Sequence, residues 1–158
     1  METMNVSVAE KQLVVVLGMH RSGTSLLTKG LESCGVSLQM VDEGAEDNPK
    51  GFWEDPAIKA INIDLMKQLD LAWDSTRSAL HLMLDTEQIK ALEARAVETI
   101  LAKLNTTDNW GFKDPRTSRL LPFWHRVFEQ VAIEPDFIVA IRHPFSVASS
   151  LQVRNHFT

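Results

Sequence analysis

The 158-residue chain has the length of one domain and a globular composition, 44% hydrophobic and 23% charged, which excludes collagen-like, low-complexity and disordered proteins. Asp and Glu outnumber Lys and Arg by 21 to 16, and the net charge of -5 argues against a general nucleic-acid binder. Any anion that this chain binds must therefore be held by a local basic cluster.

The first part of the chain predicts a strand, a glycine-containing loop and a helix. The β-branched run Gln12–Leu17 is typical of a buried strand in a parallel sheet and ends at Gly18. Leucines at helical spacing indicate a helix over Thr24–Cys34, and Gly35 is a natural left-handed stop. The leucines at this spacing are Leu26, Leu27 and Leu31. This order opens many α/β nucleotide-binding folds.

The middle of the chain predicts a long surface loop over residues 42–53 followed by two amphipathic helices. Asp55-Pro56 is an N-cap followed by a first-turn proline, and Thr86 marks the start of the second helix. The apolar face of the first helix consists of Ile58, Ile61, Leu65 and Leu69. The stripe of the second helix consists of Ile89, Leu92, Ala96, Ile100 and Leu104.

The last part of the chain predicts two more strands. The pattern predicts a short strand over Trp110–Lys113, and Asp114-Pro115 can cap a helix after it. We expect a proline to end that helix in a turn, and a new helix to follow over Phe123–Val131. Asp136–Ile141 has the pattern of a second buried strand. Pro144 then opens a helix whose inward residues should be Val147, Ala148 and Leu151.

Alternating strands and helices predict one α/β domain over residues 12–158, a three-layer α/β/α arrangement around a central parallel sheet. Residues 1–11 are polar and are expected to be flexible. The chain stops at or near the end of its last helix, so we expect it to be the N-terminal part of a domain truncated at its C-terminus. With a single cysteine, no signal peptide and no apolar run long enough for a membrane span, we expect a cytoplasmic protein.

The segment Gly18–Ser25, GMHRSGTS, has the spacing of the phosphate loop G-x-x-x-x-G-K-[ST], with Thr24 in place of the lysine. A loop leading into a helix N-terminus directs free N–H groups and the helix dipole at an anion. Arg21 would supply the positive charge. The other expected anion contacts are Ser22, Gly23, Thr24 and Ser25. The alternative is a strand–helix turn without a ligand.

Arg142 ends a predicted strand, at a position where a phosphate-loop kinase usually has an aspartate for Mg²⁺. Ser150 lies eight residues later, on the following helix. Because the carboxyl ends of parallel strands meet at one edge of a sheet, Arg142 should lie beside the Gly18–Ser25 loop. A structural role for this arginine remains the alternative.

These two segments together resemble the sulfotransferases that use 3′-phosphoadenosine 5′-phosphosulfate (PAPS), and most of all their bacterial branch. Asn48–Glu54 and Gly111–Arg116 are further similar blocks. The resemblance implies a phosphate-loop sulfotransferase fold in which the Gly18–Ser25 loop binds the 5′-phosphosulfate, while Arg142 and Ser150 bind the 3′-phosphate. It also implies transfer of a sulfuryl group to a hydroxyl or amine of a small-molecule or carbohydrate acceptor, without a metal ion.

In this interpretation Arg21 neutralises charge on the leaving 5′-phosphate, and the acceptor needs a base. Glu54 and Asp114 are the candidates, with an exposed charge and a plain helix cap as their respective alternatives. Lys113 and Arg116 would add positive charge or lie solvated at the surface. The chain departs from the family at Leu26, where many members have an aromatic residue near the adenine. The family also has a later basic loop that closes over the nucleotide, so we expect that this chain is a fragment, that a partner completes the site, or that activity is lost.

Several further interpretations stay open. A divergent phosphate-loop kinase or nucleotidase would use Mg²⁺ and a nucleotide, and a non-catalytic nucleotide-binding domain would keep the fold alone. Of the tryptophans, Trp53 has the best position to contact an acceptor, and His20 would either touch the anion or be solvated. The pattern does not indicate the oligomeric state.

Overall fold

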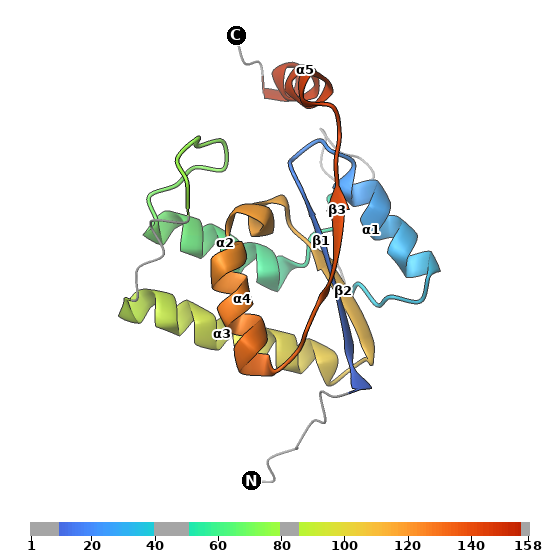
Figure 1. The fold of residues 1–158 in the computed structure, drawn as a ribbon, viewed down its shortest axis with the longest axis vertical. Helices are drawn as coiled ribbons and strands as arrows, with labels where there is room; N and C mark the ends of the chain where they lie inside the picture. The colour runs from blue at the N-terminus through green and yellow to red at the C-terminus, as the bar shows by residue number, and fades with distance from the viewer. Residues whose placement is uncertain (1–9, 40–50, 80–85, 156–158) are drawn as a thin grey trace.

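The computed structural model describes residues 10–39, 51–79 and 86–155 (Figure 1). It contains a three-stranded parallel sheet in the order β2-β1-β3. The strands are β1 (Gln12–Gly18), β2 (Asn109–Lys113) and β3 (Asp136–Ala140), each within one residue of its predicted bounds. Val15 of the central strand pairs with Phe112 on one side and Phe137 on the other. All three carboxyl ends therefore meet at one edge, as the sequence predicted.

Helices cover both faces of this sheet. They are α1 (Thr24–Ser33), α2 (Pro56–Gln68), α3 (Glu87–Leu104), α4 (Leu121–Val131), α5 (Pro144–Asn155) and the short 3₁₀ helix η2 (Pro115–Arg119). Figure 1 shows α1 on one side of the sheet, α2, α3 and α4 on the other, and α5 beyond the carboxyl end of β3. The larger core lies between β1 and the three-helix side, and a smaller one around Val14, Val36 and Leu38 lies on the α1 side.

Local signals placed the middle helices correctly. The Asp55 carboxylate accepts hydrogen bonds from the Ala57 and Ile58 amides, and Pro56 occupies the first turn of α2. The Thr86 hydroxyl caps α3 in the same way. The helix faces that were expected to be apolar are buried in the larger core, except that Leu92 is partly buried and packs against it. Most of the predicted loop over residues 42–53 and of the predicted flexible segment 1–11 lies outside the described residues.

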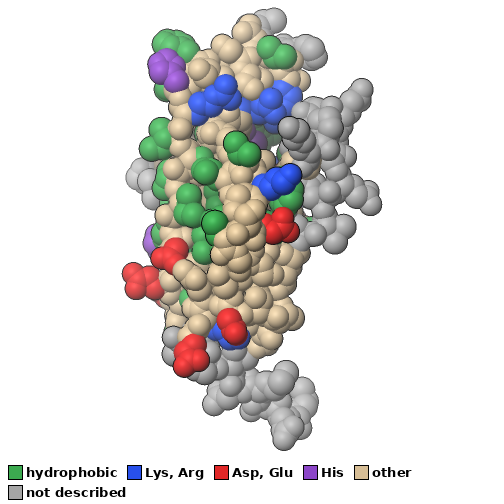
Figure 2. Space-filling view, turned by 90° about the vertical axis from the view of Figure 1, so that its right-hand side faces the viewer, with side chains coloured by type: hydrophobic (Ala, Val, Ile, Leu, Met, Phe, Trp, Pro, Cys, Tyr) green, Lys and Arg blue, Asp and Glu red, His purple; other side chains and the backbone are tan. Residues whose placement is uncertain are grey.

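The prediction that β3 is a buried strand is wrong. It pairs only with β1 and lies at the edge of the described sheet. Phe137 contacts Phe128 of α4, but Val139 is 58% exposed and Ile141 88% exposed. Figure 2 looks at the α1 and β3 side of the molecule and shows hydrophobic side chains along this surface. The apolar run therefore predicted the strand correctly but not its burial.

Residue spacing indicated the buried faces of α1 and α5 only in part. Thr24 and Thr28 are the buried residues of α1, whereas Leu26 and Leu27 are exposed. In α5, Val147 and Leu151 are buried as expected, but Ala148 is exposed. Among the described residues, no helix combines the length and apolar character that a membrane span requires.

Candidate functional site

The loop Gly18–Ser25 leaves the central strand at the edge where all three strands end. Gly18 has a φ of 150°, and a Cβ atom there would lie 2.8 Å from the Ala140 carbonyl oxygen of β3. Only glycine lets the two chain segments approach so closely. Gly23 is in the left-handed conformation and precedes α1 without a side-chain cap. The loop therefore places the uncapped N-terminus of α1 at this edge.

The two arginines expected to bind an anion lie next to each other. Arg142 Nη1 donates a hydrogen bond to the backbone oxygen of Arg21 at 2.9 Å, and Arg21 Nε donates one to Ser150 Oγ at 2.8 Å. Arg21 has a φ of 65°, a conformation that non-glycine residues rarely adopt. The structure thus joins the two motifs directly, although 121 positions separate Arg21 from Arg142.

Both arginines line one cavity of about 790 Å³ at the carboxyl edge of the sheet. Its basic lining residues are Arg21, Lys29, Lys59, Lys113, Arg116, Arg142 and Arg154. Glu54 is the one acidic side chain among the described residues that line it. In a chain of net charge -5, this is the local basic cluster that an anion would need. Arg142 and Ser150 also line an adjacent cavity of about 490 Å³.

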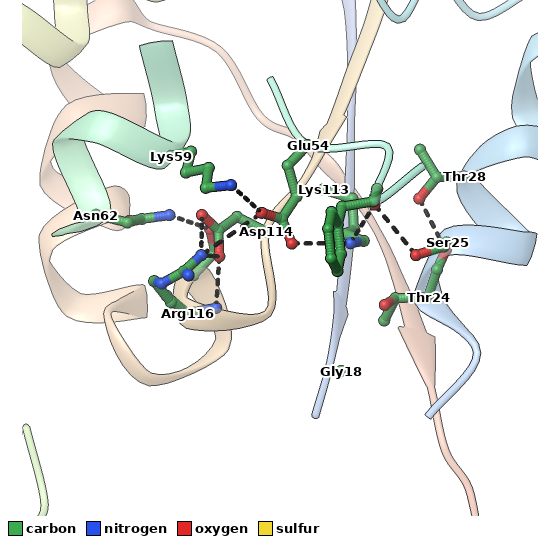
Figure 3. Close-up of polar contacts among 12 residues, drawn as sticks. Gly18, Thr24, Ser25, Thr28, Glu54, Lys59, Asn62, Lys113, Asp114 and Arg116 are labelled. Atoms are coloured by element: carbon green, nitrogen blue, oxygen red, sulfur yellow. Dashed lines mark hydrogen bonds and ion pairs between the residues drawn. The ribbon is translucent and has the colours of Figure 1, made fainter. Parts of the chain in front are cut away.

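The segment Gly51–Glu54 closes one side of this cavity. The Phe52 carbonyl oxygen accepts hydrogen bonds from Ser25 Oγ at 3.1 Å and from Lys113 Nζ at 2.6 Å. These two bonds tie the segment to the start of α1 and to the end of β2 (Figure 3). The Ser25 hydroxyl was expected to bind an anion, but in this structure it donates its hydrogen bond to the Phe52 carbonyl oxygen.

Glu54 lies at the centre of a buried charge cluster (Figure 3). Its carboxylate is 3.1 Å from Lys113 Nζ, 3.5 Å from Lys59 Nζ and 3.6 Å from Arg116 Nη1. Burial disfavours the charged carboxylate, but the nearby lysines and arginine together outweigh it and hold the pKa of Glu54 below its ordinary value. Glu54 is 8% exposed and Lys113 1% exposed, so the solvated alternatives for both residues are wrong.

Asp114 is completely buried behind this cluster. It caps η2 by accepting from the Arg116 amide at 2.9 Å, and it binds the Arg116 guanidinium at 2.9 and 3.0 Å. Burial raises the pKa of Asp114, although Arg116 acts in the opposite direction. Asp114 is not among the residues that line the cavity. The contacts of Asp114 are those of a helix cap, which was the alternative to its role as the base.

The remaining predicted residues divide into two groups. Gly23, Thr24 and Ser25 line the larger cavity with Arg21 and Arg142. Ser22 instead donates its hydroxyl to the Met19 carbonyl oxygen at 2.6 Å.

Sequence reasoning did not single out Arg154 as a lining residue, and it left Trp73 open between the core and the lining of a cleft. The Trp73 ring lies 5.1 Å from the His20 ring, and the Arg154 guanidinium lies 5.3 Å from the Trp73 ring. Arg154 follows Ser150 by one helical turn on α5, so the i, i+4 spacing could have indicated that it shares a face with Ser150. Trp73 stands in a loop after α2, and no local pattern brings that loop to the cavity.

Within the described parts of the chain, no group of three or more His, Cys, Asp or Glu residues is arranged to hold a metal ion. The chain matches no protein-family model, no curated protein and no solved structure at a significant level.

Proposed function

We propose that this chain is a cytoplasmic sulfotransferase domain with a phosphate-loop fold, which binds PAPS and transfers its sulfuryl group to a hydroxyl or amine acceptor. The observation that supports this most directly is the contact between Arg142 and Arg21 in one basic cavity. Two arginines from different motifs at one cavity suit a nucleotide with a phosphate on both its 5′ and its 3′ position, whereas a nucleoside monophosphate would need only one.

Arg21 and the N-terminus of α1 would hold the 5′-phosphosulfate. As the sulfuryl group departs, negative charge grows on the bridging oxygen and the 5′-phosphate, and a guanidinium at that place stabilises it. An arginine keeps its proton near neutral pH, so its contribution is electrostatic.

Arg142 would hold the 3′-phosphate. Only Nη1 of this guanidinium donates to the Arg21 backbone, and its planar fork can offer further N–H groups to phosphate oxygens. Ser150, one hydrogen bond away from Arg21, would complete the contact.

The residues favour this function over a kinase or nucleotidase. A phosphate-loop kinase uses a lysine at the position of Thr24 and an aspartate for Mg²⁺ near the end of a neighbouring strand. Here the end of β3 is followed by Arg142, whose positive charge repels a metal ion. A transferring sulfuryl group carries less negative charge than a phosphoryl group, so a single cation at the bridging oxygen can suffice.

Calorimetric titration with adenosine 3′,5′-bisphosphate, in buffer containing a metal chelator, tests the proposal. We expect binding at least about tenfold tighter than that of adenosine 5′-monophosphate, because one charge-assisted contact contributes about 1.5–3 kcal/mol. Absence of bisphosphate binding would contradict the proposal, and so would a preference for a nucleoside triphosphate with Mg²⁺. Binding without release of sulfate or sulfated product from PAPS would favour a non-catalytic nucleotide-binding domain.

A further inference from the structure

We propose that His20 is the base that takes the acceptor's proton, and that it becomes an effective base only when the donor anion fills the cavity. This inference rests on the proposed function, and it assigns to His20 the role for which Glu54 and Asp114 were the candidates.

The geometry leaves His20 free to accept a proton. It directly precedes Arg21 in the loop and lines the same cavity. Its ring packs against Trp73 with 5.1 Å between centroids, which restricts where the imidazole lies. Within the described parts of the chain, no hydrogen bond engages either ring nitrogen. A ring nitrogen is therefore available to an incoming hydroxyl or amine beside the group that Arg21 would hold.

The two carboxylates are less suitable because they are already engaged. Glu54 contacts three cationic side chains, which stabilise its charged form and make it a weak base. Asp114 is completely buried, caps η2 and binds Arg116 with both oxygens. Freeing either carboxylate to accept a proton would leave buried cations without their partners, at a large cost.

The charges around His20 explain why the donor matters. Burial is the largest cause that lowers the pKa of His20 from 6.5 to about 4, followed by Arg116 on η2, while Arg154 on α5 and Lys113 on β2 act in the same direction. Glu54 opposes them. At neutral pH the imidazole is therefore uncharged, but its affinity for a proton is low.

Binding of the donor would raise the pKa of His20 again. A 3′-phosphate together with a phosphosulfate brings about four negative charges, since a phosphate monoester alone carries about two at neutral pH. These charges would offset Arg116, Arg154 and Lys113 and raise the pKa of His20 toward neutrality, where a general base works best.

The transfer step then balances. The acceptor oxygen or nitrogen forms a bond to sulfur, and the bond between sulfur and the bridging oxygen breaks. The electron pair of that bond moves to the 5′-phosphate oxygen beside Arg21. The proton of the acceptor moves to the free ring nitrogen of His20, and the imidazolium returns it to solvent after the products leave.

Proton uptake on ligand binding provides the first test. Adenosine 5′-phosphosulfate is the probe, because its phosphate and sulfate groups do not titrate near neutral pH. Calorimetry at about pH 6, in buffers of different ionisation enthalpy, measures the protons taken up per ligand bound. We expect a substantial fraction of one proton for the wild type and for the control His125→Gln, and almost none for His20→Gln. His125 is exposed on α4 and does not line the cavity. Equal uptake by His20→Gln and the wild type would overturn the inference.

Single-turnover release of sulfate from PAPS, with water as the acceptor, provides the second test. We expect His20→Gln to slow release by about 100-fold or more, the usual contribution of a general base, while donor affinity changes only a few-fold. An unchanged rate and pH profile would overturn the role of His20. If His20→Gln does not fold, the ring-proton NMR shift of His20 in the wild type, titrated with and without the probe, replaces it, and an unshifted titration contradicts the inference. If the wild type binds neither PAPS nor the probe, the proposed function itself is wrong.

Discussion

Lys113 and Glu54 are the residues that couple the fold to the site. Lys113 ends β2, is almost completely buried, and donates to both the Phe52 carbonyl oxygen and the Glu54 carboxylate. A buried ammonium group is tolerated only when its hydrogen bonds and its charge are satisfied. The ion pair therefore fixes the Gly51–Glu54 segment against the sheet while keeping positive charge close to the cavity.

Replacing Glu54 with Gln should destabilise the protein at neutral pH by about 1–3 kcal/mol, because Lys113 keeps a hydrogen-bond acceptor but loses its counter-charge. The pKa of Glu54 is lowered in the folded state. Its stabilising effect is thus fully present above the ordinary glutamate value of 4.5 and is lost as the pH falls through the lower folded value. Urea unfolding measured from neutral to strongly acidic pH should give free energies of unfolding that become equal for the wild type and the variant in acid.

Lys59→Gln is the matched control, because Lys59 is partly exposed and lies 3.5 Å from the same carboxylate. Its effect should stay within about 1 kcal/mol, as for other exposed ion pairs. A constant difference between Glu54→Gln and the wild type at every pH would show that the carboxylate charge is not what stabilises this cluster.

At the residue scale, motif spacing singled out Arg21 and Arg142, and the shared edge of a parallel sheet predicted their proximity. The burial of Lys113 and Glu54 could not be predicted in this way. It depends on the Gly51–Glu54 segment crossing the end of β2, which is a tertiary contact without a local signal. The same reason explains why the sequence did not decide between the core and the cavity lining for Trp73.

At the scale of single elements, caps and periodicity located the helices, but only neighbouring elements decide which face is buried. The exposed Leu26 and Leu27 of α1 illustrate this, because the helix turns its threonines to the sheet. Thr28 can be buried there because its hydroxyl donates to the Thr24 carbonyl oxygen at 2.9 Å within the helix.

Two glycine-to-alanine replacements should have opposite effects on stability. Gly18→Ala would place a methyl group 2.8 Å from the Ala140 carbonyl oxygen, at a φ of 150°, and should destabilise the protein by about 1–3 kcal/mol. Gly30→Ala in α1 meets nothing within 4 Å and should stabilise it by about 0.5–1 kcal/mol. Urea midpoints measure both changes. A neutral Gly18→Ala would contradict the close approach of β1 and β3 at the loop.

At the scale of the whole molecule, the described sheet has an uncovered edge. Parallel sheets are usually covered on both faces, yet Val139 and Ile141 are exposed beside the open edge of β3. In Figure 2, basic side chains gather toward the upper end of this side, and most of the acidic ones toward the lower end. An apolar surface next to an unpaired strand favours association between molecules.

Val139→Lys should therefore reduce concentration-dependent association while changing the free energy of unfolding by about 0.5 kcal/mol or less, as for most exposed sites. Sedimentation velocity over a range of concentrations measures the association. A reducing agent is needed because Cys34 is exposed and could link two molecules. Identical sedimentation of the variant and the wild type at every concentration would contradict this role for the β3 edge.

The central claim is that Arg21 and Arg142 hold opposite ends of one doubly phosphorylated nucleotide. The most direct measurement compares the affinities of Arg142→Ala for adenosine 3′,5′-bisphosphate and adenosine 5′-monophosphate. Arg95→Ala serves as the control, since Arg95 pairs with Asp64 and does not line the cavity. Arg142→Ala should weaken bisphosphate binding by about 10- to 100-fold, the value of one charge-assisted contact, and leave the monophosphate nearly unchanged. Equal losses for the two ligands would contradict the claim.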